Sequence, residues 1–293
     1  MNKNQKRGVL FAILAAAFYA LNSPFSKLLL HRVSPTMMAT FLYLGAGLGM
    51  ALMQAIESNR GLAAKEQKLT RKELPYTISM VVLDIAAPIA LMIGISKTSA
   101  ANASLLNNFE IVATTLIALL VFKEAISKKL WLGIGLVTLS SIILSAQDMS
   151  SLSFSAGSAF VLIACICWGF ENNCTRMLSS KNPVQIVVIK GIFSGLGSLV
   201  ITLVIGESLP DVWSILMVLG LGFIAYGLSI VFYIYAQREL GAAKTSAYYA
   251  VAPFIGVALS LVIFLEVPSY SFWAALLIMI AGTYFVTVAD QNG

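Results

Sequence analysis

The chain has 293 residues, of which 59% are hydrophobic and only 11% are charged. Soluble domains carry roughly 25% charged residues, so this composition excludes an ordinary water-soluble protein. The formal net charge is +6, but in so apolar a chain we expect the basic residues in loops between membrane helices, not on a nucleic-acid-binding surface. Since a bilayer crossing takes roughly 20 apolar residues, the composition predicts an all-α membrane protein.

Apolar runs bounded by charges and prolines predict ten transmembrane helices. The predicted helices span residues 9–30, 35–56, 74–96, 100–122, 129–147, 155–178, 183–205, 211–237, 242–265 and 271–289. Residues 1–22 also resemble a signal peptide, but the nine further spans favour a first helix that is retained. Only residues 57–73 form a sizeable polar connection.

Lysine and arginine residues are concentrated in alternate connections between the predicted helices. Fifteen lie on the side of the amino terminus, three lie on the other side (Lys27, Arg32 and Lys97), and Lys190 falls within a helix. Basic connections stay in the cytoplasm during membrane insertion. We therefore expect a multi-pass protein of the bacterial cytoplasmic (inner) membrane with both termini in the cytoplasm, in contact with the lipid bilayer.

The second half of the chain repeats features of the first. An offset of 149 residues pairs Tyr19, Asn22, Ser26 and Lys27 with Trp168, Glu171, Thr175 and Arg176, and an offset of 142 pairs Ala100, Ala101, Glu124 and Trp131 with Ala242, Ala243, Glu266 and Trp273. Because each copy contains five helices, an odd number, the second copy enters the membrane from the opposite face. The sequence thus predicts two five-helix inverted-topology repeats, residues 1–148 and 149–293, within one membrane domain.

Two copies of a small-residue segment that leads to an acidic helix end carry a family resemblance. They read AANASLLNNFEIVATTLIALLVFKE and GAAKTSAYYAVAPFIGVALSLVIFLE. With them, the chain resembles ten-helix members of the drug/metabolite transporter superfamily, of the EamA type, over essentially its whole length. The resemblance implies transport of amino acids and other small metabolites, often outward, without ATP. One departure is that the proline usual in this segment stands in the second copy, as Pro253, but not in the first, where Glu110 or Ile111 stands.

Four ionisable residues fall at lipid depth: Asp84, Glu110, Glu171 and Lys190. Each costs about 2.5 to 3.5 kcal/mol at a helix centre, so they must face a cavity or one another. Lys190 and one acid could form a buried structural pair, but three carboxylates and one ammonium leave a deficit of positive charge. A desolvated neutral carboxyl group, a bound cation or a cationic portion of the substrate would remove that deficit. We therefore take Glu110, Glu171 and Asp84 as proton-coupling candidates.

Polar and aromatic residues at helical spacing predict a shared lining between the two copies. Tyr19, Asn22 and Ser26 recur as Trp168, Glu171 and Thr175, and the fourth helix carries Asn107, Glu110 and Thr114 at a similar spacing. An aromatic face beside carboxylates suits ammonium groups, although packing or interface anchoring is the alternative for each ring. The predicted substrate-binding residues, on a cavity lined mainly by helices 1, 3, 4, 6, 8 and 9, are Tyr19, Asn22, Asp84, Asn107, Glu110, Trp168, Glu171, Asn172, Lys190 and Tyr248; Tyr226, Tyr233 and Tyr249 are weaker candidates.

Prolines and glycines mark places where the helices bend or approach closely. Pro24, Pro88 and Pro253 each remove a backbone hydrogen bond within a predicted helix, which is typical of helices that bend around a cavity. Small residues four apart on the second and seventh helices favour close helix packing.

Enzymatic signatures are absent from the sequence. It has no phosphate-binding loop, no HExxH motif, no nucleophile elbow and no second histidine beside His31, and its three cysteines lie in one apolar segment. We therefore expect no catalytic residue, no metal site, no cofactor and no ATP-driven step. A membrane-embedded enzyme or a sensor is the alternative of another class, but the first would show an interfacial motif and the second a signalling domain.

The sequence therefore predicts a secondary transporter that works by alternating access. Its small-molecule substrate would be an amino acid or a related small amine, exported, with Glu110 or Glu171 either exchanging a proton or binding the substrate nitrogen. Import of a quaternary amine or a nucleoside-like metabolite is the alternative among transporters.

Overall fold

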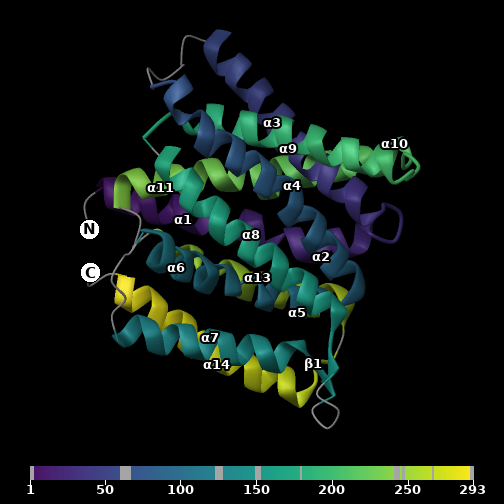
Figure 1. The fold of residues 1–293 in the computed structure, drawn as a ribbon, viewed down its shortest axis with the longest axis vertical. Coiled ribbons are helices and arrows are strands. Elements are labelled where there is room, and N and C mark those ends of the chain that lie inside the picture. Colours follow the sequence, from purple (N-terminus) through teal and green to yellow (C-terminus); the bar gives the residue numbers. More distant parts are fainter. Residues whose placement is uncertain are drawn as a thin grey trace.

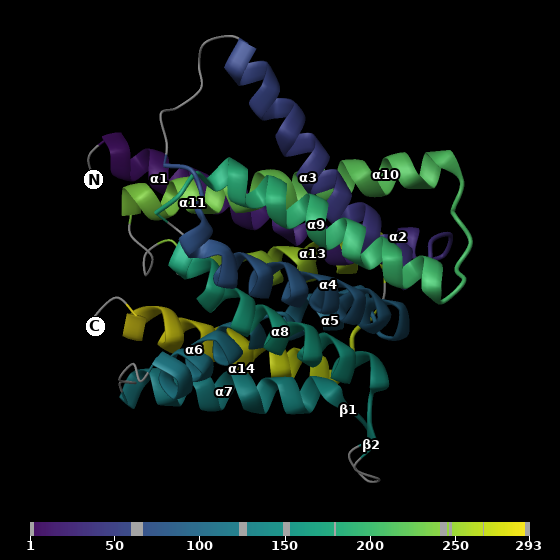
Figure 2. The same ribbon diagram turned by 45° about the horizontal axis from the view of Figure 1, so that its top comes forward.

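The computed structural model describes residues 3–59, 67–122, 128–148, 153–178, 180–240, 245, 248–265 and 267–290. The described chain is almost entirely helical, and most of its helices lie side by side along one common direction (Figure 1). Both chain ends lie at the same end of this bundle, which we call the terminal end (Figures 1 and 2). A short strand pair lies at the other end, which we call the opposite end.

The elements follow the predicted spans closely. In the first half they are α1 (Lys3–Ala20), α2 (Asn22–Leu29), α3 (Pro35–Asn59), η1 (Arg71–Glu73), α4 (Leu74–Lys97), α5 (Ala100–Leu106), α6 (Phe109–Phe122), α7 (Lys128–Ser145) and β1 (Ala146–Asp148). In the second half they are β2 (Ser153–Phe154), α8 (Ala156–Leu178), α9 (Pro183–Val204), α10 (Val212–Gly222), the π-helix η2 (Phe223–Leu228), α11 (Ser229–Leu240), α13 (Ala252–Phe264) and α14 (Tyr270–Asp290). The strands β1 and β2 pair antiparallel between α7 and α8.

Six described spans are long and apolar enough to cross a membrane, and three shorter apolar helices accompany them. The six spans are Asn4–Leu29, Pro35–Ile56, Arg71–Lys97, Ala100–Val121, Pro183–Val204 and Val212–Ala236. The shorter apolar helices are Trp131–Ser145, Ala252–Phe264 and Tyr270–Phe285. Together with α8, these elements occupy the ten predicted places, which confirms the prediction of an all-α, ten-helix membrane protein.

Three of the ten spans are broken near their middle. The first is interrupted at Leu21, three residues before Pro24, and the ninth turns at Ala250 and Val251, just before Pro253. The fourth is interrupted at Asn107 and Asn108 without any proline. The offset of 142 residues between the two copies pairs Asn108 with Ala250. The fourth and ninth helices therefore break at equivalent positions of the repeat, although their sequences differ there. Pro88, by contrast, lies inside an unbroken α4.

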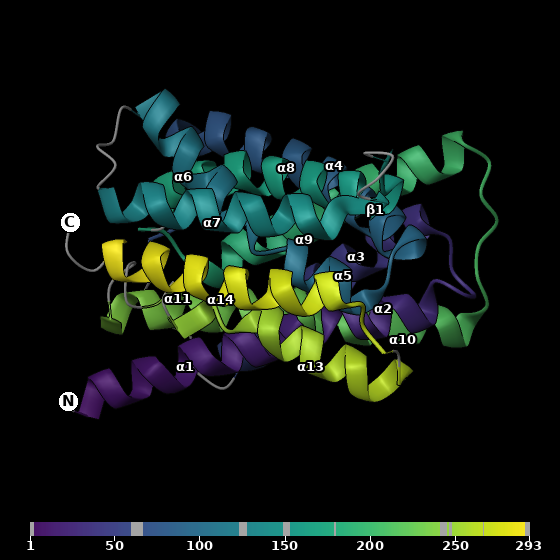
Figure 3. The same cartoon turned by 90° about the horizontal axis from the view of Figure 1, so that it is seen from below.

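The two copies interlock, because the most extensive helix contacts join one half of the chain to the other. α4 packs against α8 and α1 against α11, while α3 packs against α9 and α7 against α14. The repeat relates α4 to the eighth span, which contains α11, and α8 to the first span, which contains α1. The α4–α8 and α1–α11 contacts are therefore equivalent in the two copies. Figure 3 shows that α1 starts from the terminal end, whereas α8 starts beside the strands at the opposite end. The repeats therefore have inverted topology.

Glycines allow α3 and α9 to cross with their backbones nearly touching. A Cβ atom on Gly191 would lie 2.3 Å from the backbone nitrogen of Gly47, so neither position tolerates a side chain without moving a helix. This confirms that small residues serve the packing of these two helices, as the sequence indicates.

The fold leaves the predicted domain boundary and the predicted orientation in the membrane untested. The division of the repeats at residue 148 stays a prediction, and so does the cytoplasmic placement of the termini. The acidic helix ends Glu124 and Glu266 lie outside the described residues, as does the side chain of Arg176.

Candidate functional site

A buried ion-pair triad joins three helices at the centre of the bundle. The ammonium nitrogen of Lys190, on α9, lies 3.1 Å from Oδ2 of Asp84 on α4 and 3.0 Å from Oε1 of Glu171 on α8. All three side chains are buried. With every group ionised the triad carries a formal charge of −1, and removing its only cation would leave two buried carboxylates uncompensated.

Two aromatic side chains complete the surroundings of Asp84. The hydroxyl of Tyr43, on α3, donates to Oδ1 of Asp84 at 2.8 Å, and the indole nitrogen of Trp168 donates to the same oxygen at 3.2 Å. Trp168 and Glu171 stand one turn apart on α8, so a single helix contributes both a donor and an acid to the triad. These hydrogen bonds to a charged acceptor hold the carboxylate in one orientation.

The third carboxylate, Glu110, lies at the start of α6 and has different partners. Its Oε1 accepts a hydrogen bond from the amide of Asn172 at 2.7 Å, and the same amide lies 3.3 Å from the hydroxyl of Thr114. On α8 itself, the hydroxyl of Thr175 donates to Oε1 of Glu171, one turn earlier in the helix. Among the ion pairs of the described residues, none involves Glu110. Glu110 is therefore a partly exposed carboxylate held by neutral groups.

Tyrosine rings connect the triad to the region of Glu110. The centroids of Tyr43 and Tyr226 lie 5.2 Å apart, those of Tyr226 and Tyr19 lie 6.1 Å apart, and those of Tyr19 and Tyr249 lie 5.9 Å apart. Asn22 donates to the hydroxyl of Tyr226 at 3.0 Å. Tyr226 belongs to η2, and π-helical turns are uncommon and frequently occur at functional sites. The rings thus form a continuous aromatic row drawn from both copies.

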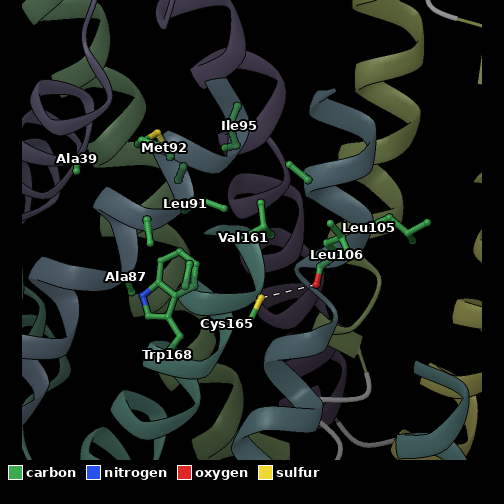
Figure 4. Close-up of a cluster of buried hydrophobic side chains, with 14 of the residues drawn as sticks. Ala39, Ala87, Leu91, Met92, Ile95, Leu105, Leu106, Val161, Cys165 and Trp168 are labelled. Carbon is green, nitrogen blue, oxygen red and sulfur yellow. Dashed lines mark hydrogen bonds between the residues drawn. The ribbon is translucent and has the colours of Figure 1, made fainter. Parts of the chain in front are cut away.

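The polar residues of the site are exposed to different extents along the bundle. Partly exposed side chains lie towards the terminal end: Tyr19, Glu110, Thr114, Asn172, Thr175 and Tyr249. Towards the opposite end lies a buried apolar cluster that includes Met38, Leu91, Met92 and Ile95. A cavity of about 270 Å³ lies at the same end, between α5, α7, α13 and α14. Figure 4 shows part of this cluster, with Trp168 at its border and the thiol of Cys165 directed to the carbonyl oxygen of Leu106. The partly exposed polar side chains of the site therefore lie towards the terminal end.

The structure brings most of the predicted site residues together. Tyr19, Asn22, Asp84, Glu110, Trp168, Glu171, Asn172 and Lys190 all take part in the contacts above. Asn107 lies at the break between α5 and α6 and lines a small cavity. Tyr248 is 37% exposed, and the ring contacts are made by its neighbour Tyr249.

The sequence did not indicate Tyr43 as a site residue, and the second and seventh helices were not among those expected to line the site. Tyr43 stands in an otherwise apolar span, and no charge near it in the sequence marks it. Its partner Asp84 lies on another helix, so only the packing of α3 against α4 reveals the pair. Lys190 was predicted as a site residue, and it brings α9 into the lining beside the helices expected there.

The described residues contain no group of three or more His, Cys, Asp or Glu side chains that could hold a metal ion. The three cysteines are free thiols, and Cys165 is buried.

Comparison with known proteins points to membrane transport. The model of the EamA-like transporter family matches residues 6–146 and 155–288. An "Uncharacterized transporter" of Methanothermobacter thermautotrophicus is 24% identical over 301 residues, covering 95% of this chain and 85% of the relative. "Uncharacterized transporter YyaM" of Bacillus subtilis is 20% identical over 230 residues, or 74% of each chain. A solved crystal structure covers 97% of both chains with a TM-score of 0.69 at 13% identity, which shows a shared fold alone.

Proposed function

The chain belongs to the EamA-like transporter family, within the drug/metabolite transporter superfamily, and we propose that this member is a secondary transporter that exports amino acids or related small amines across the bacterial cytoplasmic membrane. The observation that carries this proposal is the excess of buried negative charge at the interface of the two copies. The family supports a membrane transporter; the substrate, the direction and the coupling are our inference.

The charge balance favours a substrate with an ammonium group. Asp84, Glu171 and Glu110 together carry three negative charges when ionised, against the single charge of Lys190. Lys190 already lies between two carboxylates, so a substrate carboxylate would compete with two ion pairs for it. A substrate ammonium, by contrast, would reduce the excess of negative charge and would be stabilised in a region of low dielectric.

The surroundings of Glu110 fit such a group. Glu110 is partly exposed and stands three residues after Asn107, which lines a small cavity together with Tyr19. The rings of Tyr19 and Tyr249 pack against each other. A cation beside the face of a tyrosine gains about 0.5 to 2 kcal/mol, more as water is excluded. We therefore assign substrate binding to Tyr19, Glu110 and Asn172, with Asn22, Asn107, Trp168 and Tyr248 as further candidates.

The interlocked, inverted copies support alternating access. In this structure the partly exposed polar residues lie towards the terminal end, and a buried apolar cluster lies towards the opposite end. In an inverted-repeat transporter the two copies exchange conformations, which would open the opposite end and close the terminal end. A carboxylate that gains and loses a proton during this exchange would couple transport to a proton gradient, and Glu110, Glu171 and Asp84 are the candidates.

The test is transport by the purified chain in liposomes, with a panel of radiolabelled amino acids and amines, with and without a pH gradient. We expect Glu110→Gln to weaken transport of the accepted substrate by roughly 10- to 100-fold, the value of one hydrogen bond to a charged group. The same change should flatten the pH dependence of transport. Glu207→Gln is the matched control, because Glu207 contacts the hydroxyls of Ser34 and Thr36 at the opposite end.

Glu171→Gln is the second informative variant, because it changes the triad while leaving Glu110 in place. If transport and its pH dependence were the same in the wild type, Glu110→Gln and Glu171→Gln, the proposed role of the carboxylates would be wrong. If no amine or amino acid of the panel were transported, the proposed substrate class would be wrong.

A further inference from the structure

We propose that the crossing of three broken helices holds an alkali cation of the size of Na⁺. A small cavity of about 10 Å³ lies where α1 and α2, α5 and α13 meet, next to the breaks of the first, fourth and ninth spans. Its lining includes Ser23, Ser104 and Asn107, which carry oxygen atoms, and Gly256, which has no side chain. A volume of about 10 to 15 Å³ suffices for one water-sized body.

One hydroxyl in this cavity has no partner. Ser104 is 3% exposed, and its Oγ accepts and donates no hydrogen bond in the described structure. Buried hydroxyl groups are almost always hydrogen-bonded, and leaving one unpaired costs about 1 to 3 kcal/mol. An occupant that coordinates this oxygen would remove the cost.

A backbone oxygen faces the same point as this hydroxyl. A Cβ atom built on Gly256 would lie 2.9 Å from Oγ of Ser104 and 3.3 Å from the carbonyl oxygen of Ala20. Pro24 has no N–H group, so it cannot donate the helical hydrogen bond to the carbonyl of Ala20. The break in the first helix therefore presents a carbonyl oxygen next to the Ser104 hydroxyl, and the glycine keeps the space between them free.

These oxygens suit a hard monovalent cation. Hydroxyl and carbonyl oxygens are the ligands that alkali ions take in proteins, and unwound helix segments coordinate Na⁺ in other inverted-repeat transporters. A water molecule would fit the same space, but it would leave the charge of the bundle unchanged.

The neighbouring charge favours a cation over water. Glu110 stands three residues after the cavity residue Asn107, and its backbone nitrogen donates to the carbonyl oxygen of Asn107 at 3.1 Å. The buried triad carries a formal charge of −1 and Glu110 adds a further carboxylate, so a bound cation would offset part of that excess. Because all three helix breaks meet here, the ion would favour one arrangement of the broken helices. An effect of this ion on transport would rest on the proposed transport function, but its binding does not.

The experiment measures thermal unfolding of the purified full chain in detergent while NaCl replaces choline chloride at constant ionic strength. A ligand present at 100 times its Kd should raise Tm by roughly 5 °C, and the rise should saturate. Ser104→Ala should raise the apparent Kd for Na⁺ by about tenfold or more, since it removes one coordinating oxygen. Ser23→Ala is a second variant and should act in the same direction.

Ser198→Ala is the matched control. Ser198 on α9 is also buried with an unpartnered hydroxyl, but it does not line this cavity. Its sodium response should equal that of the wild type. A wild-type Tm that is the same in both salts, as expected for a cavity that holds water only, would overturn the proposal. A response that is unchanged in both Ser104→Ala and Ser23→Ala would overturn it as well. Because no substrate is involved, failure of the transport panel leaves the result of this experiment intact.

Discussion

The two ends of the bundle are built differently although the two copies are related by inversion. At the opposite end, methionines and aliphatic side chains form a buried cluster, and the ammonium of Lys27 lies 2.7, 3.2 and 2.7 Å from the carbonyl oxygens of Ile95, Ser96 and Thr98. Towards the terminal end, Glu110 and its polar neighbours are partly exposed. An exact inversion would make the ends alike. Under the alternating access proposed above, this difference would mark one of two conformations.

The ion-pair triad lies where these two regions meet. Asp84 and its donors Tyr43 and Trp168 border the apolar cluster, while Glu171 shares α8 with the partly exposed Asn172. Lys190 joins the two sides. If the triad holds these two regions together, removing its lysine should lower the stability of the protein much more than removing a lysine from an ion pair near the surface.

The largest effect is expected for Lys190→Met. This variant leaves Asp84 and Glu171 buried without a counter-charge, and breaking a buried ion pair costs about 3 to 5 kcal/mol. We expect little folded protein and a strongly lowered Tm in detergent, measured by thermal unfolding of the purified chain. Restoring neutrality with Asp84→Asn and Glu171→Gln in the same chain should recover most of the loss.

The control is an ion pair near the surface at the terminal end. Lys181 lies 3.4 Å from Glu73, and both side chains are partly exposed. Ion pairs that water reaches contribute about 0 to 1 kcal/mol, so Lys181→Met should lower Tm far less than Lys190→Met. Equal losses in the two lysine variants would contradict the buried, structural role of the triad.

The second effect concerns the closure of the opposite end. Lys27→Met removes the cation from three carbonyl oxygens at the end of α4, and hydrogen bonds to charged groups contribute about 1.5 to 3 kcal/mol. The opposite end should then open more often. A cysteine introduced at buried Ala103, in a chain without its native cysteines, should react roughly tenfold faster or more with a membrane-impermeant maleimide.

Lys97→Met is the matched control, because Lys97 is an exposed lysine at the same end of α4. It changes the charge near the membrane surface by the same amount. A labelling rate that rises equally in both variants would show that surface charge, not the contact of Lys27 with the carbonyl oxygens, explains the change.

Helix positions could be predicted from the sequence because a membrane helix is defined by its own residues. The apolar runs, and the charges that end them, were enough to predict the positions of all ten helices. The offsets between the two halves of the chain were enough to predict the two inverted repeats. The break at Asn107 and Asn108 could not be predicted, because no proline marks it and α5 packs against a helix far away in the sequence, α13. For the same reason the sequence identified Asp84 and Lys190 as buried charges but could not show that Tyr43 holds Asp84 in place.

The smallest effect is expected for Tyr43→Phe, which tests the hydrogen bond between Tyr43 and Asp84. Tyr43→Phe removes only the hydroxyl that donates to Asp84 at 2.8 Å, while Trp168 still donates to the same oxygen at 3.2 Å. We expect a loss of about 1 to 2 kcal/mol in the free energy of unfolding, far less than for Lys190→Met, because no charge is left without its ion pair. Thermal unfolding would measure it, with Tyr76→Phe at a 37% exposed position as the control. If the two phenylalanine variants had the same stability, the hydrogen bond from Tyr43 would contribute nothing measurable. Lys190 and Trp168 alone would then hold Asp84, and the triad would stand without support from α3.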